Sequence, residues 1–92
     1  MPEPLFSVGR ILTTPGALQA MNRTGDDITS FLVRHLRGDW GELCREDCLA
    51  NEQGLREGLR LLSAYRLRDG TKIWVITGGD RSATTILLPD EY

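Results

Sequence analysis

The sequence predicts an α+β fold with an N-terminal strand, three short helices, and a C-terminal three-stranded antiparallel meander that carries the helices on one face. Two observations lead to this class. In the first two thirds of the chain, apolar residues recur every three to four positions, as in amphipathic helices. In the last third, apolar and polar residues alternate around an Asp-Gly turn, as in a β-hairpin. With 92 residues the chain can build one modest core, so we expect a single domain over residues 1–92.

The N-terminal strand and the first helix are expected to meet at a Thr-Pro step. The run from Leu5 to Thr14 is rich in apolar and β-branched residues, which favour a strand. Thr14 then serves as a helix N-cap, and Pro15 takes the first helical position, where its missing N–H costs nothing. The helix ends at Gly25. Its buried side is expected to carry Ala17, Leu18 and Met21.

The second helix is expected to begin after Asp27 and to end at Gly38. Its apolar positions follow the helical period: Ile28, Phe31, Leu32, His35 and Leu36. The only histidine of the chain therefore lies on the buried stripe. Trp40 follows in a tight connector, and two roles are open for it. It fills the seam where the second and third helices meet the sheet, or it stays exposed as an anchor for a partner.

The third helix is expected to run from about Leu43 to Leu59. One side of this helix presents Cys44, Cys48, Asn51, Leu55 and Leu59. Both thiols are expected to face the core. Their spacing lacks the C-x-x-C pattern of structural zinc sites, so we expect neither a disulfide nor a metal site.

The meander is predicted from two runs, "LLSAYRLR" and "TKIWVIT", that flank Asp69-Gly70. A third run, "TTILLP", completes it and ends at Pro89. A two-residue turn would set the following pairs: Arg68 with Thr71, Tyr65 with Trp74, and Ala64 with Val75.

This register divides the side chains between two faces of the sheet. The face expected to pack on the helices carries Leu62, Ala64, Ile73, Val75, Ile86 and Leu88. The second face carries Leu61, Ser63, Tyr65, Lys72, Trp74, Ile76, Thr85 and Leu87. Because the second face mixes apolar and polar residues, either another part of the chain covers it or it binds a partner.

The composition limits the classes of function. It is that of an ordinary soluble globule, with 40% hydrophobic and 26% charged residues. A formal net charge of −2 creates no global positive field for nucleic acid. No apolar run approaches the roughly 20 residues that span a bilayer, and the start lacks the pattern of a secretory signal. We therefore expect a cytoplasmic protein without a membrane segment or a cofactor.

Two sets of site residues follow from the second face. An enzyme would use His35 as a general base beside hydroxyl and amine groups from the sheet: Ser63, Tyr65, Lys72 and Thr85. In the other interpretation His35 is a buried structural residue. A binding protein would use aromatic anchors together with a small basic tip, which could hold a phosphate but not a duplex. That set is Tyr65, Trp74, Trp40, Lys72, Arg66 and Arg68.

Three runs, "RHLRGDWGEL", "LREGLRLLSAYRLRDGTKIWVIT" and "DRSATTILLP", resemble a family of small bacterial proteins encoded on plasmids and other mobile elements. The likeness extends from Leu5 to Tyr92. Members carry the labels "type I restriction endonuclease subunit M" or "plasmid-related protein". The chain has neither the glycine-rich loop for S-adenosylmethionine nor the Asn/Asp-Pro-Pro-aromatic motif of a methyltransferase subunit, so the first label is not carried over. The resemblance implies a setting in which small proteins modulate host defence or plasmid maintenance.

These observations favour a non-enzymatic accessory protein that binds a macromolecular partner, a protein rather than a nucleic acid. In the setting that the resemblance implies, the partner would belong to a host defence system. The alternative is a small ribonuclease-like enzyme that uses the side of the sheet with His35, Lys72 and Tyr65.

Overall fold

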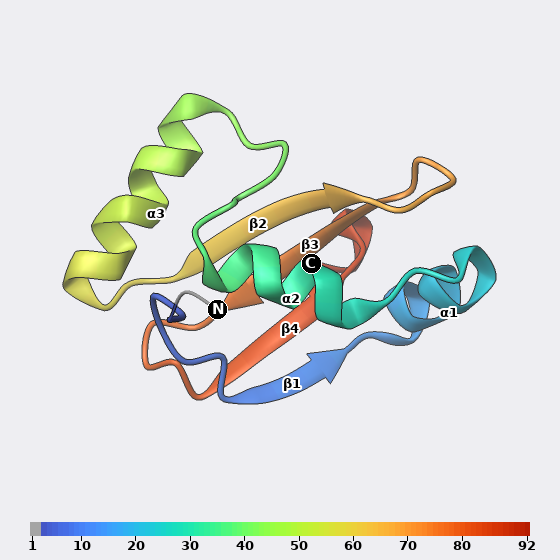
Figure 1. Cartoon of the computed structure of the whole chain (residues 1–92), viewed down its shortest axis with the longest axis horizontal. Helices are drawn as coiled ribbons and strands as arrows, with labels where there is room; N and C mark the ends of the chain where they lie inside the picture. The colour runs from blue at the N-terminus through green and yellow to red at the C-terminus, as the bar shows by residue number, and fades with distance from the viewer. Residues whose placement is uncertain (1–2) are drawn as a thin grey trace.

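The computed structural model describes residues 3–92 and confirms the α+β class (Figure 1). The elements follow in this order: β1 (Arg10–Thr13), α1 (Pro15–Thr24), α2 (Ile28–Leu36), α3 (Arg45–Glu57), β2 (Leu61–Arg66), β3 (Lys72–Thr77), β4 (Ala83–Leu87) and the 3-10 helix η1 (Pro89–Glu91). None of the helices within residues 3–92 is long and apolar enough to cross a bilayer.

Local sequence signals explain the first two helices. The Thr14 side chain accepts from the N–H of Ala17 at 3.3 Å and caps α1, which ends at Gly25 in the left-handed conformation, with φ of 75°. The Asp27 side chain accepts from the N–H of Thr29 at 3.0 Å and caps α2. Both helices therefore begin at the residues that the sequence predicts.

The sheet has four strands in the order β1-β4-β3-β2. The predicted meander is present, since β2 pairs antiparallel with β3 and β3 with β4. The N-terminal strand joins it as an edge, parallel to β4, and it spans Arg10–Thr13 rather than residues 5–14. Gly9 explains the late start, because its φ of 62° breaks the extended chain where it passes the carbonyl of Ser82.

The predicted register of the hairpin between β2 and β3 is wrong by one residue. Leu67 and Thr71 close a three-residue loop. The N–H of Leu67 donates to the Thr71 carbonyl at 2.8 Å, and the N–H of Gly70 donates to the Leu67 carbonyl at 2.9 Å. Gly70 is left-handed, with φ of 88°, as expected for the last residue of such a loop. The pairs are Tyr65 with Ile73, Ala64 with Trp74, and Ser63 with Val75.

The shift by one residue reverses the faces of β2. The face that packs on α1 and α2, here called the helix face, carries Leu61, Ser63, Tyr65, Ile73, Val75, Thr77, Thr84 and Ile86, all of them buried. Ala64 therefore does not point toward the helices. The helices contribute Ala17, Ala20, Met21 and Phe31 to this core. Figure 1 shows α2 lying across the helix face.

The third helix does not lie on the helix face but along the outer edge of β2 (Figure 1). It begins at Arg45, with Cys44 as an exposed N-cap residue and Cys48 half-buried, so the prediction that both thiols face the core is wrong. Asn51 is the residue that attaches α3 to the sheet. Its amide donates to the Leu62 carbonyl at 2.6 Å and accepts from the Leu62 N–H at 2.9 Å.

Candidate protein-binding surface

A buried series of polar side chains crosses the helix face. The His35 ring lies between two hydroxyls, with Nδ1 2.5 Å from Ser63 Oγ and Nε2 2.9 Å from Thr77 Oγ1. Thr77 Oγ1 is 2.7 Å from Thr84 Oγ1, and the Thr84 hydroxyl donates to the Val8 carbonyl at 2.8 Å. The series ends at a carbonyl, which can only accept, and this fixes the direction of each hydrogen bond before it.

The direction of the series assigns the proton on His35. Because the Thr84 hydroxyl is used as a donor, Thr84 Oγ1 accepts from Thr77, and Thr77 in turn accepts from the Nε2–H of His35. Burial, helped by the positive charge of Arg81, lowers the pKa of His35 to about 4. The ring is therefore neutral at neutral pH and accepts the Ser63 O–H at Nδ1.

A histidine that accepts a serine hydroxyl has the geometry of an activated nucleophile, but this pair cannot reach a substrate. His35, Ser63 and Thr77 expose no surface. Phe6 and Trp40 pack edge-on against the ring, with centroids 5.1 Å and 5.7 Å from that of His35. The series therefore satisfies buried polar groups and holds α2 against β2 and β3.

The other residues of the ribonuclease-like alternative lie away from His35. Lys72 and Thr85 belong to the sheet face opposite the helices. Tyr65 is on the helix face, but its hydroxyl donates to the Asp39 carbonyl at 2.6 Å, and burial raises its pKa to about 12. Of the candidate catalytic residues, only Ser63 therefore meets His35, and the set as a whole does not converge on one site.

The predicted binding residues are also divided. Tyr65 and Trp40 are buried, so neither is available as an anchor. Trp74, Lys72 and Arg66 share the face opposite the helices, while Arg68 lies in the exposed β2–β3 loop. The predicted neighbourhood of Tyr65 and Trp74 is wrong, because the two side chains point to opposite faces of the sheet.

The sheet face that turns away from α1 and α2 is called the open face. Two rows of side chains cross it from strand to strand. One row is Ala64, Trp74 and Leu87; the other is Leu62, Ile76, Thr85 and Leu12. Every member of the second row keeps part of its surface in contact with solvent, and Leu12 is 42% exposed. Both rows are mainly apolar.

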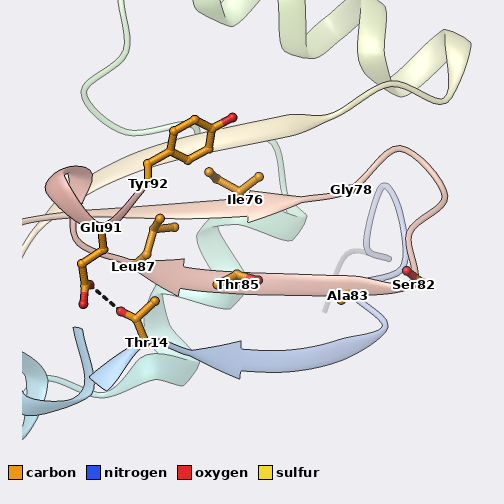
Figure 2. Close-up of a pocket in the computed structure, with 9 residues that line it drawn as sticks. All are labelled: Thr14, Ile76, Gly78, Ser82, Ala83, Thr85, Leu87, Glu91 and Tyr92. Atoms are coloured by element: carbon orange, nitrogen blue, oxygen red, sulfur yellow. Dashed lines mark hydrogen bonds between the residues drawn. The ribbon is translucent and has the colours of Figure 1, made fainter. Parts of the chain in front are cut away.

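A hollow of about 510 Å³ lies on the open face (Figure 2). Ile76, Thr85 and Leu87 line it from the middle of the sheet, and Tyr92 and Glu91 stand at one end. Tyr92 is 74% exposed, and its ring meets that of Trp74 edge-on, with centroids 5.8 Å apart. The aromatic pair of the open face is therefore Trp74 with Tyr92.

Glu91 holds the end of the hollow in place. Its carboxylate accepts from the Thr14 hydroxyl at 2.5 Å, from the Leu88 N–H at 2.8 Å and from the Gly16 N–H at 3.1 Å (Figure 2). These hydrogen bonds, that of Thr14 above all, lower the pKa of Glu91. The negative charge is thus used at the start of α1 and is not directed into the hollow.

The sequence contains little sign of this arrangement. Pro89 indicates the end of a strand, but nothing local indicates that Glu91 returns to Thr14 or that Tyr92 reaches Trp74. The role of Asn51 at the β2 edge was likewise missed. The signal that could have found it is its place on the inner side of α3, where an amide needs a buried polar partner.

No group of three or more histidine, cysteine, aspartate or glutamate side chains among residues 3–92 is placed to hold a metal ion. Comparison with known proteins gives no further guide, because no family model, curated protein or solved structure matches this chain.

Proposed function

We propose that this chain is a small non-enzymatic accessory protein that binds a protein partner through its open face. One observation carries the proposal: α1 and α2 leave this face uncovered, and its row Leu62, Ile76, Thr85 and Leu12 keeps part of its apolar surface in contact with solvent. A 92-residue domain needs its apolar side chains for the core, so an uncovered apolar face favours a binding role. The half-buried Trp74, packed edge-on against Tyr92, is the central anchor.

The charges of the open face favour a protein over a nucleic acid. Arg66 is paired with Glu42 at 2.9 Å. The face carries two further cations, Lys72 and Arg10, and they lie at opposite ends of the sheet register. Two separated cations and a net charge of −2 supply little of the phosphate neutralisation that nucleic-acid binding requires. An apolar patch with few charges suits a protein surface.

The ribonuclease-like function is not favoured, because His35 is enclosed and Lys72 lies on the other side of the sheet. The mobile-element setting adds a class of partner to the proposal. The partner would be a component of a host defence system, which this protein would modulate or inhibit.

Capture from a bacterial lysate with two matched variants tests the proposal. Ile76→Lys places a charge in the open face, whereas Leu49→Lys places the same charge on α3, where Leu49 is 52% exposed. We expect wild type and Leu49→Lys to retain one stoichiometric protein, and Ile76→Lys to lose it while its circular dichroism stays unchanged. Equal retention by both variants contradicts the proposal, as does retention of RNA that disappears as salt rises.

A further inference from the structure

The two edges of the sheet differ in how their main-chain groups are satisfied. At the β2 edge, Asn51 binds both the N–H and the carbonyl of Leu62. The neighbouring outward residue, Ala64, donates to the Trp40 carbonyl at 3.0 Å and accepts from the Glu42 N–H at 2.7 Å. This edge is therefore closed to any further strand.

The β1 edge is open. Arg10 donates to the Ser82 carbonyl and Thr14 to the Ile86 carbonyl, so these residues direct their main-chain groups toward β4. Alternation along the strand turns the N–H and carbonyl of Ile11 and Thr13 outward. No described element lies beyond β1 in Figure 1.

The centre of this edge carries no charge, proline or bulge, although β1 is short and begins with Arg10. Natural edge strands discourage pairing by being very short, or with charges, prolines or bulges. Here Ile11 and Leu12, at the centre of β1, are 41% and 42% exposed. They point to opposite faces, since Ile11 pairs with Thr84 of the helix face and Leu12 with Thr85 of the open face. An added strand would thus find open hydrogen-bonding groups and an apolar contact on each face.

We infer that a second copy of this chain occupies the edge, with the two β1 strands antiparallel about a two-fold axis through Leu12. In this register Ile11 of each copy lies opposite Thr13 of the other. The outward N–H and carbonyl groups of both residues are then all paired. Leu12 meets its symmetry mate on the open face as a non-hydrogen-bonded pair, with Cα atoms about 4.5 Å apart. Arg10 lies opposite Thr14, so no like charges face each other.

The limits of β1 select this register over its neighbours. Antiparallel partners must both point outward or both point inward, so the register can move only in steps of two. A shift of two residues toward the N-terminus pairs Thr13 with Gly9, whose N–H already donates to Ser7 Oγ at 3.3 Å. A shift of two residues toward the C-terminus pairs Ile11 with Pro15, which has no N–H. Only pairing through Leu12 uses every outward group of β1, and the self-complementary fit favours a second copy over an unrelated strand.

Crosslinking at the axis tests the inference. Both native cysteines are first replaced by serine, and Leu12→Cys is compared with Arg10→Cys. In the Leu12→Cys dimer the two introduced thiols would meet within the Cα range of a disulfide, about 4.4 to 6.8 Å. In the Arg10→Cys dimer the two introduced thiols would be offset by four residues, about 13 Å along the strands. Under mild oxidation we expect Leu12→Cys to form a covalent dimer and Arg10→Cys to stay largely monomeric.

Sedimentation equilibrium of the wild-type protein gives an answer that does not depend on the variants folding. We expect a monomer–dimer equilibrium that shifts to dimer as concentration rises. Ile76→Lys should keep this equilibrium, because Ile76 lies in β3, two strands away from the β1 edge. A wild-type protein that is monomeric at every concentration overturns the inference, as does equal crosslinking of the two cysteine variants. Neither result tests partner binding at Ile76 and Trp74, which lie in β3, two strands away from this edge.

Discussion

His35 makes the stability of this protein depend on pH between about pH 6.5 and pH 4. Burial, and secondarily the positive Arg81, lowers the pKa of His35 from its ordinary 6.5 to about 4. As pH falls below about 6.5 the unfolded chain binds a proton at this ring, whereas the folded protein does not until about pH 4. The stabilising contribution is therefore complete above about pH 6.5 and is lost progressively toward pH 4.

The size of the effect follows from the pKa difference. At about pH 5 the unfolded chain has gained most of its proton and the folded protein almost none, which corresponds to about 2 kcal/mol of lost stability at roughly 1.4 kcal/mol per pH unit. With urea slopes of about 1 to 3 kcal/mol per molar, the unfolding midpoint falls by about 1 to 2 M. Urea titrations followed by far-UV circular dichroism, between about pH 7.5 and pH 5, measure this shift.

A variant isolates the contribution of the ring. His35→Gln removes the titrating group, so its stability should be lower than that of wild type at about pH 7.5 and nearly constant down to about pH 5. Any slope that His35→Gln keeps comes from other groups, so the difference between wild type and this variant isolates the ring. A wild-type stability that is flat or rises toward acid, or a slope that His35→Gln retains, would refute the assignment of this pH dependence to His35.

Three further predictions concern single positions. Asn51→Ala should lower the free energy of unfolding by about 1 to 3 kcal/mol, because both main-chain groups of Leu62 lose their partner; an unchanged urea midpoint would contradict this. Gly41→Ala should lower the melting temperature far more than Gly70→Ala, since both glycines have positive φ but only Gly41 lacks room for a Cβ atom; equal effects would show that crowding is unimportant there. A thiol reagent should label Cys44 of the native protein rapidly and the half-buried Cys48 slowly, as measured by peptide mapping. Slow labelling of Cys44 would contradict its exposed position.

Helix starts could be predicted from the sequence because their signals are local. Thr14-Pro15 and Asp27 supply caps within three residues of the groups that they satisfy. The burial of His35 could be predicted for the same reason, since the helical phase of α2 alone places it beside Phe31. These inferences need no knowledge of the sheet.

The hairpin register could not be predicted, because β2 is apolar on both faces. The residues of "LLSAYR" alternate between its two faces, and each face carries both apolar and polar side chains. A slip of one residue would therefore put a similar mixture on each face, so the pattern does not select one register. Asp69-Gly70 fits both a two-residue turn and a three-residue loop. The partners of His35 and the aromatic pair of the open face both depend on this register.

Contacts between the ends of the chain could not be predicted either. β1 pairs with β4, and Thr14 meets Glu91 across 77 positions of sequence. A four-residue strand carries too few residues to specify a parallel neighbour, and the carboxylate of Glu91 has no local pattern that indicates its target. The open face and its hollow are products of these long-range contacts.

The central claim, that the open face binds a protein partner, is tested most directly by the two tryptophan indole N–H signals in a ¹⁵N-labelled sample. Trp74 lies on the open face, while Trp40 is buried beside His35 and serves as an internal control. On titration with the captured partner, we predict that the Trp74 signal shifts to saturation and that the Trp40 signal stays in place. A shift of the Trp40 signal without one of the Trp74 signal would contradict binding by the open face, as would a shift of Trp74 by an RNA oligonucleotide that added salt abolishes.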